Sequence, residues 1–94
     1  MTGPRIDSVA YTDRFKRDYR RAPKNIQEAV EDCLRRLCSD EARKSLRFHA
    51  LSGYRLTIYK IDVLRHSWQI TMRIEARVAT LRRLAPHKQI DRQP

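Results

Sequence analysis

Apolar positions repeat with a helical period between Pro23 and Ser39. They recur at i, i+3, i+4, i+7, i+8, i+11 and i+12, which places them in one continuous stripe along a helix. Acidic side chains lie toward the start of this segment and basic ones toward its end, the order that the helix dipole favours. The pattern predicts a helix over residues 24–38, with an apolar stripe formed by Ile26, Ala29, Val30, Cys33, Leu34, Leu37 and Cys38.

A shorter amphipathic segment precedes this helix. Phe15 and Tyr19 are four residues apart, and Thr12 stands where an N-cap is expected. A proline ends the run and separates it from the longer helix. The two segments predict a helix over residues 12–21 that forms an antiparallel hairpin with residues 24–38.

The second half of the chain changes to a period of two. Apolar and polar residues alternate from 66 to 75, which is typical of a strand buried on one face. Residues 55–63 and 78–84 are rich in β-forming residues and predict the neighbouring strands, with turns at 64–65 and 76–77. We expect an antiparallel meander. In its middle strand Trp68, Ile70, Met72 and Ile74 would face the core, and Ser67, Gln69, Thr71, Arg73 and Glu75 the other side.

The remaining segments complete an α+β fold. Residues 6–12 predict a first strand, either at an edge of the sheet or beside the last strand, and residues 40–54 a loop with a short strand at Leu46–Phe48. The order is β-α-α-β-β-β, with the N-terminal strand and the helical hairpin on one face of a mainly antiparallel sheet. The second face would then be open to solvent and basic.

The length and the net charge of the chain limit the number of domains and the kinds of partner that it can have. With 94 residues and 11.2 kDa, the chain 1–94 is long enough for one domain and too short for two. Its net charge of +10 favours a polyanionic partner, either nucleic acid or an acidic protein. Residues 1–45 hold 11 Lys and Arg against 8 Asp and Glu, whereas residues 46–94 hold 10 against 3. The second half is therefore expected to carry the polyanion-binding surface.

The cysteines and the hydropathy of the chain point to a reducing compartment. Cys33 and Cys38 fit neither a disulfide framework nor a four-ligand zinc site, and are interpreted as buried thiols. The sequence has no apolar run of membrane-spanning length, and its start lacks the hydrophobic stretch of a signal peptide. We expect a cytoplasmic protein with no membrane partner.

Three segments resemble the RelE/ParE superfamily of toxins from bacterial type II toxin–antitoxin pairs. They are SVAYTDRFKRDYRRAPKNIQEAV, then ALSGYRLTIYKI, then LRRLAPH, and together they cover nearly the whole chain in the family's order. The stretch GYRLTIYK departs from the family because it merges two elements that are usually separated. The resemblance implies a RelE-like fold and a function of one of two kinds. RelE-like members cut mRNA on the ribosome, whereas ParE-like members inhibit DNA gyrase and have no known bond-breaking site.

The end of the chain carries the candidate catalytic residues. Arg83 lies four residues before His87, and a similar Arg-x-x-x-His spacing closes the last strand of the YafQ-like ribonucleases in this superfamily. The resemblance implies that His87 transfers a proton and that Arg83 clamps the charged phosphorus in the transition state. These residue types suit the reaction, since histidine exchanges protons near neutral pH and arginine binds phosphate with two hydrogen bonds.

Further cations are candidates for RNA binding. Arg82 and Arg83 alternate faces in a regular strand, so both can face one groove only if a bulge intervenes. The three histidines have no zinc-like spacing, and we expect neither a metal nor a cofactor. The candidate RNA contacts are Lys60, Arg73, Arg82, Lys88, Arg55 and His66.

Three functions remain open from the sequence. The first is a ribosome-dependent mRNA endonuclease that acts without metal through attack of a 2′-hydroxyl. The second is a gyrase inhibitor without catalytic residues, and the third a basic module that binds nucleic acid or an antitoxin. All three imply a cognate antitoxin, whose acidic amphipathic segment would dock on the open sheet face or in the groove beside residues 24–38.

Overall fold

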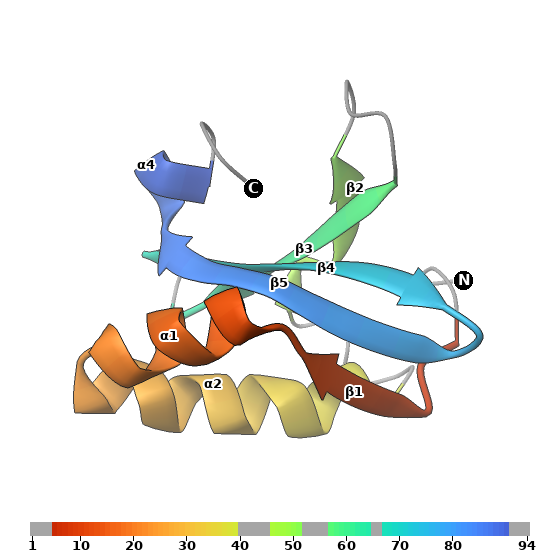
Figure 1. Cartoon of the computed structure of the whole chain (residues 1–94), viewed down its shortest axis with the longest axis horizontal. Helices are drawn as coiled ribbons and strands as arrows, with labels where there is room; N and C mark the ends of the chain where they lie inside the picture. Colours follow the sequence, from red (N-terminus) through yellow and green to blue (C-terminus); the bar gives the residue numbers. More distant parts are fainter. Residues whose placement is uncertain (1–4, 40–45, 52–56, 65–66, 91–94) are drawn as a thin grey trace.

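The computed structural model describes residues 5–39, 46–51, 57–64 and 67–90. A five-stranded sheet has two antiparallel helices on one face and a short helix near the end of the chain on the other (Figure 1). The elements are β1 (Ser8–Tyr11), α1 (Asp13–Arg21), α2 (Lys24–Leu37), β2 (His49–Leu51), β3 (Ile58–Val63), β4 (Trp68–Glu75), β5 (Val78–Pro86) and α4 (His87–Ile90). The predicted α+β architecture is confirmed, and the described residues add the strand β2 and the short helix α4.

Thr12 begins α1 and also fixes it to the sheet. Its Oγ1 accepts a hydrogen bond from the backbone N–H of Phe15 at 3.1 Å, as an N-cap does, and donates one to the carbonyl of Leu81 at 2.8 Å. The predicted cap is therefore confirmed. One hydroxyl sets both where α1 begins and how it lies against β5.

Helix α2 buries the predicted stripe, with one exception at its end. Ile26, Val30, Cys33 and Leu37 are buried, whereas Cys38 is exposed. The expectation that both cysteines are buried is wrong for Cys38, because the helix ends at Leu37 and the next residue leaves the apolar stripe.

The sheet order is β1-β5-β4-β3-β2. Strands β3, β4 and β5 form the predicted antiparallel meander, and β1 lies at an edge and pairs in parallel with β5. Both expectations for the first strand are therefore confirmed. The β4–β5 turn falls at the predicted residues Ala76 and Arg77, which both have positive φ, 50° and 64°.

The prediction of a strand at Leu46–Phe48 is wrong. Arg47 has a φ of 54°, which interrupts an extended run, and pairing with β3 starts only at His49. The side chain of Leu46 instead enters the core, and Phe48 stacks on Tyr59 with ring centroids 5.1 Å apart.

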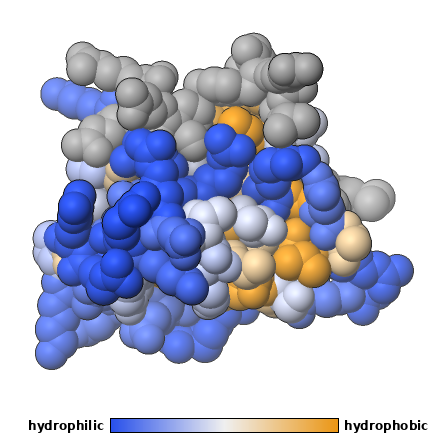
Figure 2. All heavy atoms as spheres, in the orientation of Figure 1, coloured by the Kyte–Doolittle hydropathy of each residue, from blue (hydrophilic) through white to orange (hydrophobic). Residues whose placement is uncertain are grey.

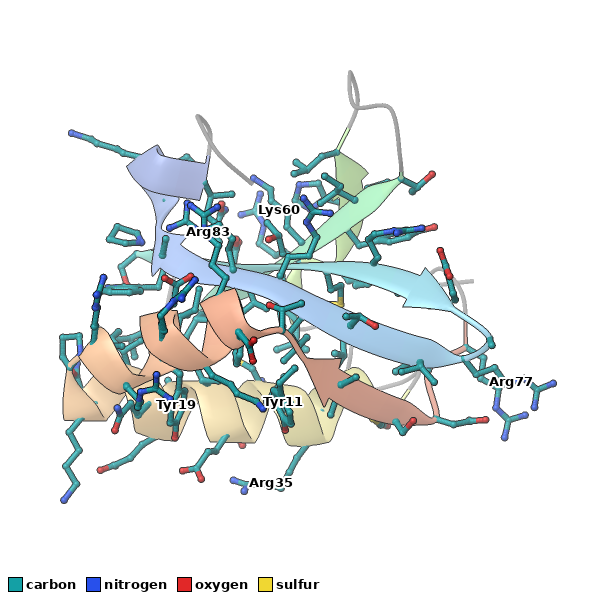
Figure 3. The ribbon with its side chains drawn as sticks, viewed as in Figure 1. Tyr11, Tyr19, Arg35, Lys60, Arg77 and Arg83 are labelled. Atoms are coloured by element: carbon teal, nitrogen blue, oxygen red, sulfur yellow. The ribbon has the colours of Figure 1, made fainter. Side chains whose placement is uncertain are left out.

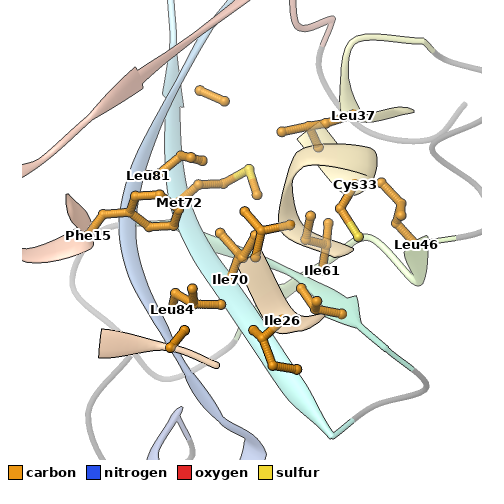
Figure 4. Packing of buried hydrophobic residues seen from close by; sticks show 14 of the residues in the cluster. Phe15, Ile26, Cys33, Leu37, Leu46, Ile61, Ile70, Met72, Leu81 and Leu84 are labelled. Atoms are coloured by element: carbon orange, nitrogen blue, oxygen red, sulfur yellow. The ribbon is translucent and has the colours of Figure 1, made fainter. Parts of the chain in front are cut away.

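One apolar core fills the space between the helices and the sheet (Figure 4). The alternation in β4 is confirmed on this side, since Ile70 and Met72 are fully buried and Trp68 packs against them from the end of the strand. The other labelled members are Phe15, Ile26, Cys33, Leu37, Leu46, Ile61, Leu81 and Leu84.

The second face of the sheet is not open, which corrects the sequence-based expectation. Gln69 and Thr71, expected to face solvent, are only 2% and 0% exposed. Helix α4 lies over this face and contacts β4 and β5 (Figure 1). Ile58, Ala85 and Ile90 are buried here, outside the main core cluster. The alternation in β4 identified the face correctly, but could not show that a helix returns to cover it.

Candidate functional site

A row of side chains crosses four strands on the second face. His49 in β2 is opposite Lys60 in β3, Lys60 is opposite Thr71 in β4, and Thr71 is opposite Arg83 in β5. Residues directly opposite in a sheet share a face, so this polar row lies on the side away from the core. Figure 3 shows Lys60 and Arg83 on the same side of the sheet, opposite α2. The fold thus brings together two predicted site residues that are far apart in the sequence.

Lys60 is buried within a polar network. The residue is 8% exposed, and Nζ donates to Oε1 of Gln69 at 3.4 Å. The amide nitrogen of Gln69 donates to Asp62 Oδ1 at 2.9 Å, and Asp62 Oδ2 lies 3.5 Å from Arg47 Nε. A buried cation is stabilised only where hydrogen-bond acceptors replace water. The network therefore holds a positive charge in place on this face before any ligand arrives.

Arg83 is held by helix α1. Its Nε lies 3.4 Å from Oδ2 of Asp18, and the same oxygen accepts the backbone N–H of Leu84 at 3.1 Å. The Arg83 side chain is 12% exposed. Asp18 thus bonds to the edge of β5 beyond the end of β1 and orients the arginine to which the family resemblance gives the phosphate.

A β-bulge explains how the two adjacent arginines are arranged. Leu81 pairs with Met72 and Arg83 with Thr71, so Arg82 is the additional residue on β5. Arg83 is the one in the polar row. Nε of Arg82 is buried, and it has no hydrogen-bond partner among the described residues.

His87 lies beyond the polar row, at the start of α4. Its backbone N–H donates to the carbonyl of Ser67 at 3.2 Å, and its side chain is exposed. Together with Ser67, Pro86 and Lys88 it borders a shallow hollow of about 430 Å³, which Arg83 does not line. Four residue steps separate Arg83 from His87, so their Cα atoms lie roughly 10 Å or more apart along the strand.

The other predicted RNA contacts fall in different places. Arg73 continues the second face along β4 and forms an ion pair with Glu75. Lys88 is exposed beside His87. Arg55 and His66 lie outside the described residues.

Sequence reasoning missed three residues that position the cations. Asp18, Asp62 and Gln69 hold Arg83 and Lys60 through the contacts above. One signal was available for Asp62, because it is two residues after Lys60 and so shares its face of a strand. The link from Asp18 to β5 spans 65 positions and had no sequence signal.

Neither a metal site nor a membrane span is found in the described part of the chain. No three or more His, Cys, Asp and Glu side chains in residues 5–39, 46–51, 57–64 and 67–90 are grouped to hold a metal ion. Within the same residues, no helix has the length and hydropathy to cross a membrane.

Sequence comparison gives no relatives, whereas structural comparison does. No family model and no curated protein matches this sequence. A chain of the RelB–RelE antitoxin–toxin complex from Methanococcus jannaschii superposes with a TM-score of 0.71 at 20% identity, over 92% of this chain and 100% of that one. The toxin–antitoxin complex RelBE2 from Mycobacterium tuberculosis gives 0.64 at 21% identity, over 86% and 98%. A free-state mutant of E. coli RelE gives 0.69 at 11% identity, over 92% and 88%.

The fold is thus a two-layer α+β domain with a cationic row on the sheet face opposite the main helices. It is the RelE-like fold, as the resemblance of the sequence segments implied.

Proposed function

We propose that this protein is the toxin of a type II toxin–antitoxin pair and that it cleaves mRNA on the ribosome, as YafQ-like ribonucleases do. The observation that carries the proposal is the row in which the buried Lys60 and the Asp18-bound Arg83 lie on one face of the sheet. The net charge of +10 and the RelE-like fold support it. Such a reaction takes place in the cytoplasm, where the ribosomes are.

The reaction needs positioned cations and a group that exchanges protons. The 2′-oxygen attacks the adjacent phosphorus, the bond to the 5′-oxygen breaks, and a cyclic phosphate and a free 5′-hydroxyl result. Arg83 and Lys60 would stabilise the additional negative charge on the phosphoryl oxygens. His87 would exchange a proton with the sugar oxygens, since the strand exit presents it to solvent beside Lys88.

The cognate antitoxin would dock in the groove between α1 and α2. This groove has a volume of about 330 Å³, and Lys16, Arg20 and Glu31 line it together with apolar and aromatic side chains. An amphipathic segment with acidic flanks fits an apolar floor with two cations on one helix. Of the two docking sites expected from the sequence, we favour the groove because of its apolar floor. The remaining lining residues are Tyr11, Phe15, Tyr19, Val30 and Leu34.

Inducible expression with mapping of mRNA 5′ ends tests the proposed function. We expect the wild type to arrest growth and to produce new 5′ ends within translated messages. Arg83→Lys, Lys60→Met and His87→Ala should each reduce cleavage at least tenfold, and Arg35→Ala, a remote exposed arginine, should leave it unchanged. Circular dichroism of the purified variants verifies that they remain folded.

Two results would contradict this assignment. Cleavage that survives in all three variants would contradict the catalytic roles of Arg83, Lys60 and His87. Growth arrest with intact mRNA, accompanied by DNA-damage signalling, would favour the gyrase-inhibitor function.

A further inference from the structure

Helix α1 carries a row of arginines next to the candidate site. Arg14 is four residues before Asp18 and Arg21 three residues after it, so both share the side of the helix that Asp18 presents to β5. Arg17 lies between them in the sequence, and it points further round the helix, away from Asp18. All three side chains are exposed.

Asp18 connects this row to the polar row of the sheet. Because its carboxylate contacts both Arg83 and the backbone of Leu84, the helix lies directly against β5 at the end of the polar row. The two groups of cations therefore meet at one junction. Figure 2 shows hydrophilic side chains gathered over α1, in contrast to the hydrophobic side chains beside β1.

The chemistry of this side of α1 fits a polyanion better than an amphipathic protein segment. Basic residues outnumber acidic ones five to two in α1, and Asp18, one of the two acids, is half-buried against β5. The aromatic residues Phe15 and Tyr19 face the groove with α2, on another side of the helix. Cations without interspersed apolar groups are typical of surfaces that follow a phosphate backbone.

The row has a suitable length for a nucleic-acid strand. From Arg14 to Arg21 the helix rises by about 10 Å, enough for the arginines to contact the phosphates of more than one nucleotide. We infer that Arg14, Arg17 and Arg21 form a phosphate-binding track that guides single-stranded RNA across α1 to the site at Arg83. The inference rests on the proposed function for its substrate, and it is tested separately from cleavage.

The test measures how RNA affinity depends on salt. The probe is a fluorescent single-stranded RNA with 2′-O-methyl groups throughout, which cannot be cleaved by attack of a 2′-hydroxyl. Wild type is compared with a triple variant, Arg14→Gln, Arg17→Gln and Arg21→Gln, in which glutamine preserves helix propensity. The matched control removes the same charge at remote, exposed positions, Arg5→Gln, Arg35→Gln and Arg77→Gln; two of these are labelled in Figure 3.

We expect the track variant to lower the slope of log affinity against log salt by about 2, since each phosphate contact on a single strand contributes roughly 0.7. At about 0.1 M salt this corresponds to a loss of affinity on the order of 100-fold. The control triple should change the slope far less. The same difference in a protein that leaves mRNA intact would support the track while refuting the proposed cleavage.

Four outcomes would overturn the inference. The two triple variants could lose affinity equally, which would mean that only net charge matters. The track variant could keep the wild-type slope, or the wild type could fail to bind the probe. The fourth outcome concerns polyglutamate as a competitor at equal charge concentration. If it displaced the RNA completely from the wild type but not from the track variant, the row of arginines would be assigned to an acidic protein.

Discussion

At the scale of the residue, the two cations of the polar row are held in different ways. Lys60 is buried and donates to the neutral amide of Gln69, whereas Arg83 lies near the carboxylate of Asp18. A carboxylate competes with phosphate for a guanidinium, and a neutral amide competes far less for an ammonium. The charge of Lys60 is therefore less neutralised by its partner and attracts an anionic ligand more strongly, whereas Arg83 gains a fixed orientation.

The two cysteines should differ in reactivity. Burial raises the pKa of the Cys33 thiol and keeps it in the unreactive protonated form, whereas Cys38 is exposed at the end of α2. We expect one thiol per chain to react with Ellman's reagent in the native protein and the second only after unfolding. In Cys38→Ser the rapid reaction of the native protein with the reagent should disappear. Rapid reaction of both thiols in the wild type would contradict the burial of Cys33.

At the scale of the element, short polar contacts fix where helices meet the sheet. Thr12 and Asp18 both reach from α1 to β5, and they attach at Leu81 and Leu84, on either side of the bulge. Strand β1 stops pairing at Leu81, so α1 takes over from it along the edge of β5. The helix thereby shields a strand edge whose unpaired groups would otherwise invite association with another chain.

Removal of the Thr12 hydroxyl should destabilise the protein through two hydrogen bonds at once. We expect Thr12→Ala to lower the free energy of unfolding by about 2 kcal/mol, near the upper end for an N-cap, because the bond to Leu81 is lost as well. Thr12→Ser keeps the hydroxyl and should recover most of the lost unfolding free energy. Urea unfolding of the two variants measures this free energy. A loss below about 0.5 kcal/mol in the alanine variant would show that neither bond matters.

The β4–β5 turn stores backbone strain. Ala76 and Arg77 both have positive φ, where a side chain costs about 1 kcal/mol or more and glycine has no such cost. Arg77→Gly should therefore raise the unfolding free energy by about 1 kcal/mol in thermal or urea denaturation. The ion pair with Asp7 that is lost is exposed and contributes little. Val78→Gly, next to the turn, should instead destabilise.

At the scale of the whole molecule, the sheet separates an apolar face from a polar one, and the centre of each is buried. The side toward α1 and α2 is filled by aliphatic side chains, and the other side holds Lys60, Gln69 and Thr71 beneath a surface to which α4 contributes. A buried polar face is stable only if its groups bond to one another. Its geometry is therefore more sensitive to substitution than that of the core.

Gln69→Leu tests this difference. The substitution keeps the size of the side chain but leaves Lys60 and Asp62 without their shared partner, and it should cost about 1–3 kcal/mol of unfolding free energy. Met72→Leu is the matched control in the same strand on the other face, and a volume-conserving change there should cost less than about 1.5 kcal/mol. Equal stability of Gln69→Leu and wild type would show that the network contributes nothing.

The periodic elements could be predicted from the sequence because a single local pattern defines each of them. The stripe from Ile26 to Leu37 and the alternation from Trp68 to Ile74 require a partner surface whatever the rest of the chain does. The turn at residues 76–77 was predicted for the same reason, since it lies between two strong strands. The failures occurred at Cys38 and Leu46, where one residue decides whether an element ends or turns.

The candidate site could be predicted only in part. Lys60 was identified by its charge and strand position and Arg83 by the family resemblance, but the bulge that separates Arg82 from Arg83 depends on pairing with β4. The half-chain charge balance directed attention to residues 46–94, whereas the fold brings the arginines of α1 beside Arg83. A count of charged residues along the chain cannot show which segments become neighbours in the fold.

The sequence by itself determined the helical hairpin, the meander and the cationic character of this protein. Local periodicity and net charge do not depend on how distant segments meet. Only the tertiary structure decided that the second face is filled, that Lys60 and Arg83 share one row, and that Asp18 joins this row to α1. These features arise from pairing and packing between residues far apart in the chain, and such contacts leave no periodic signal in the sequence.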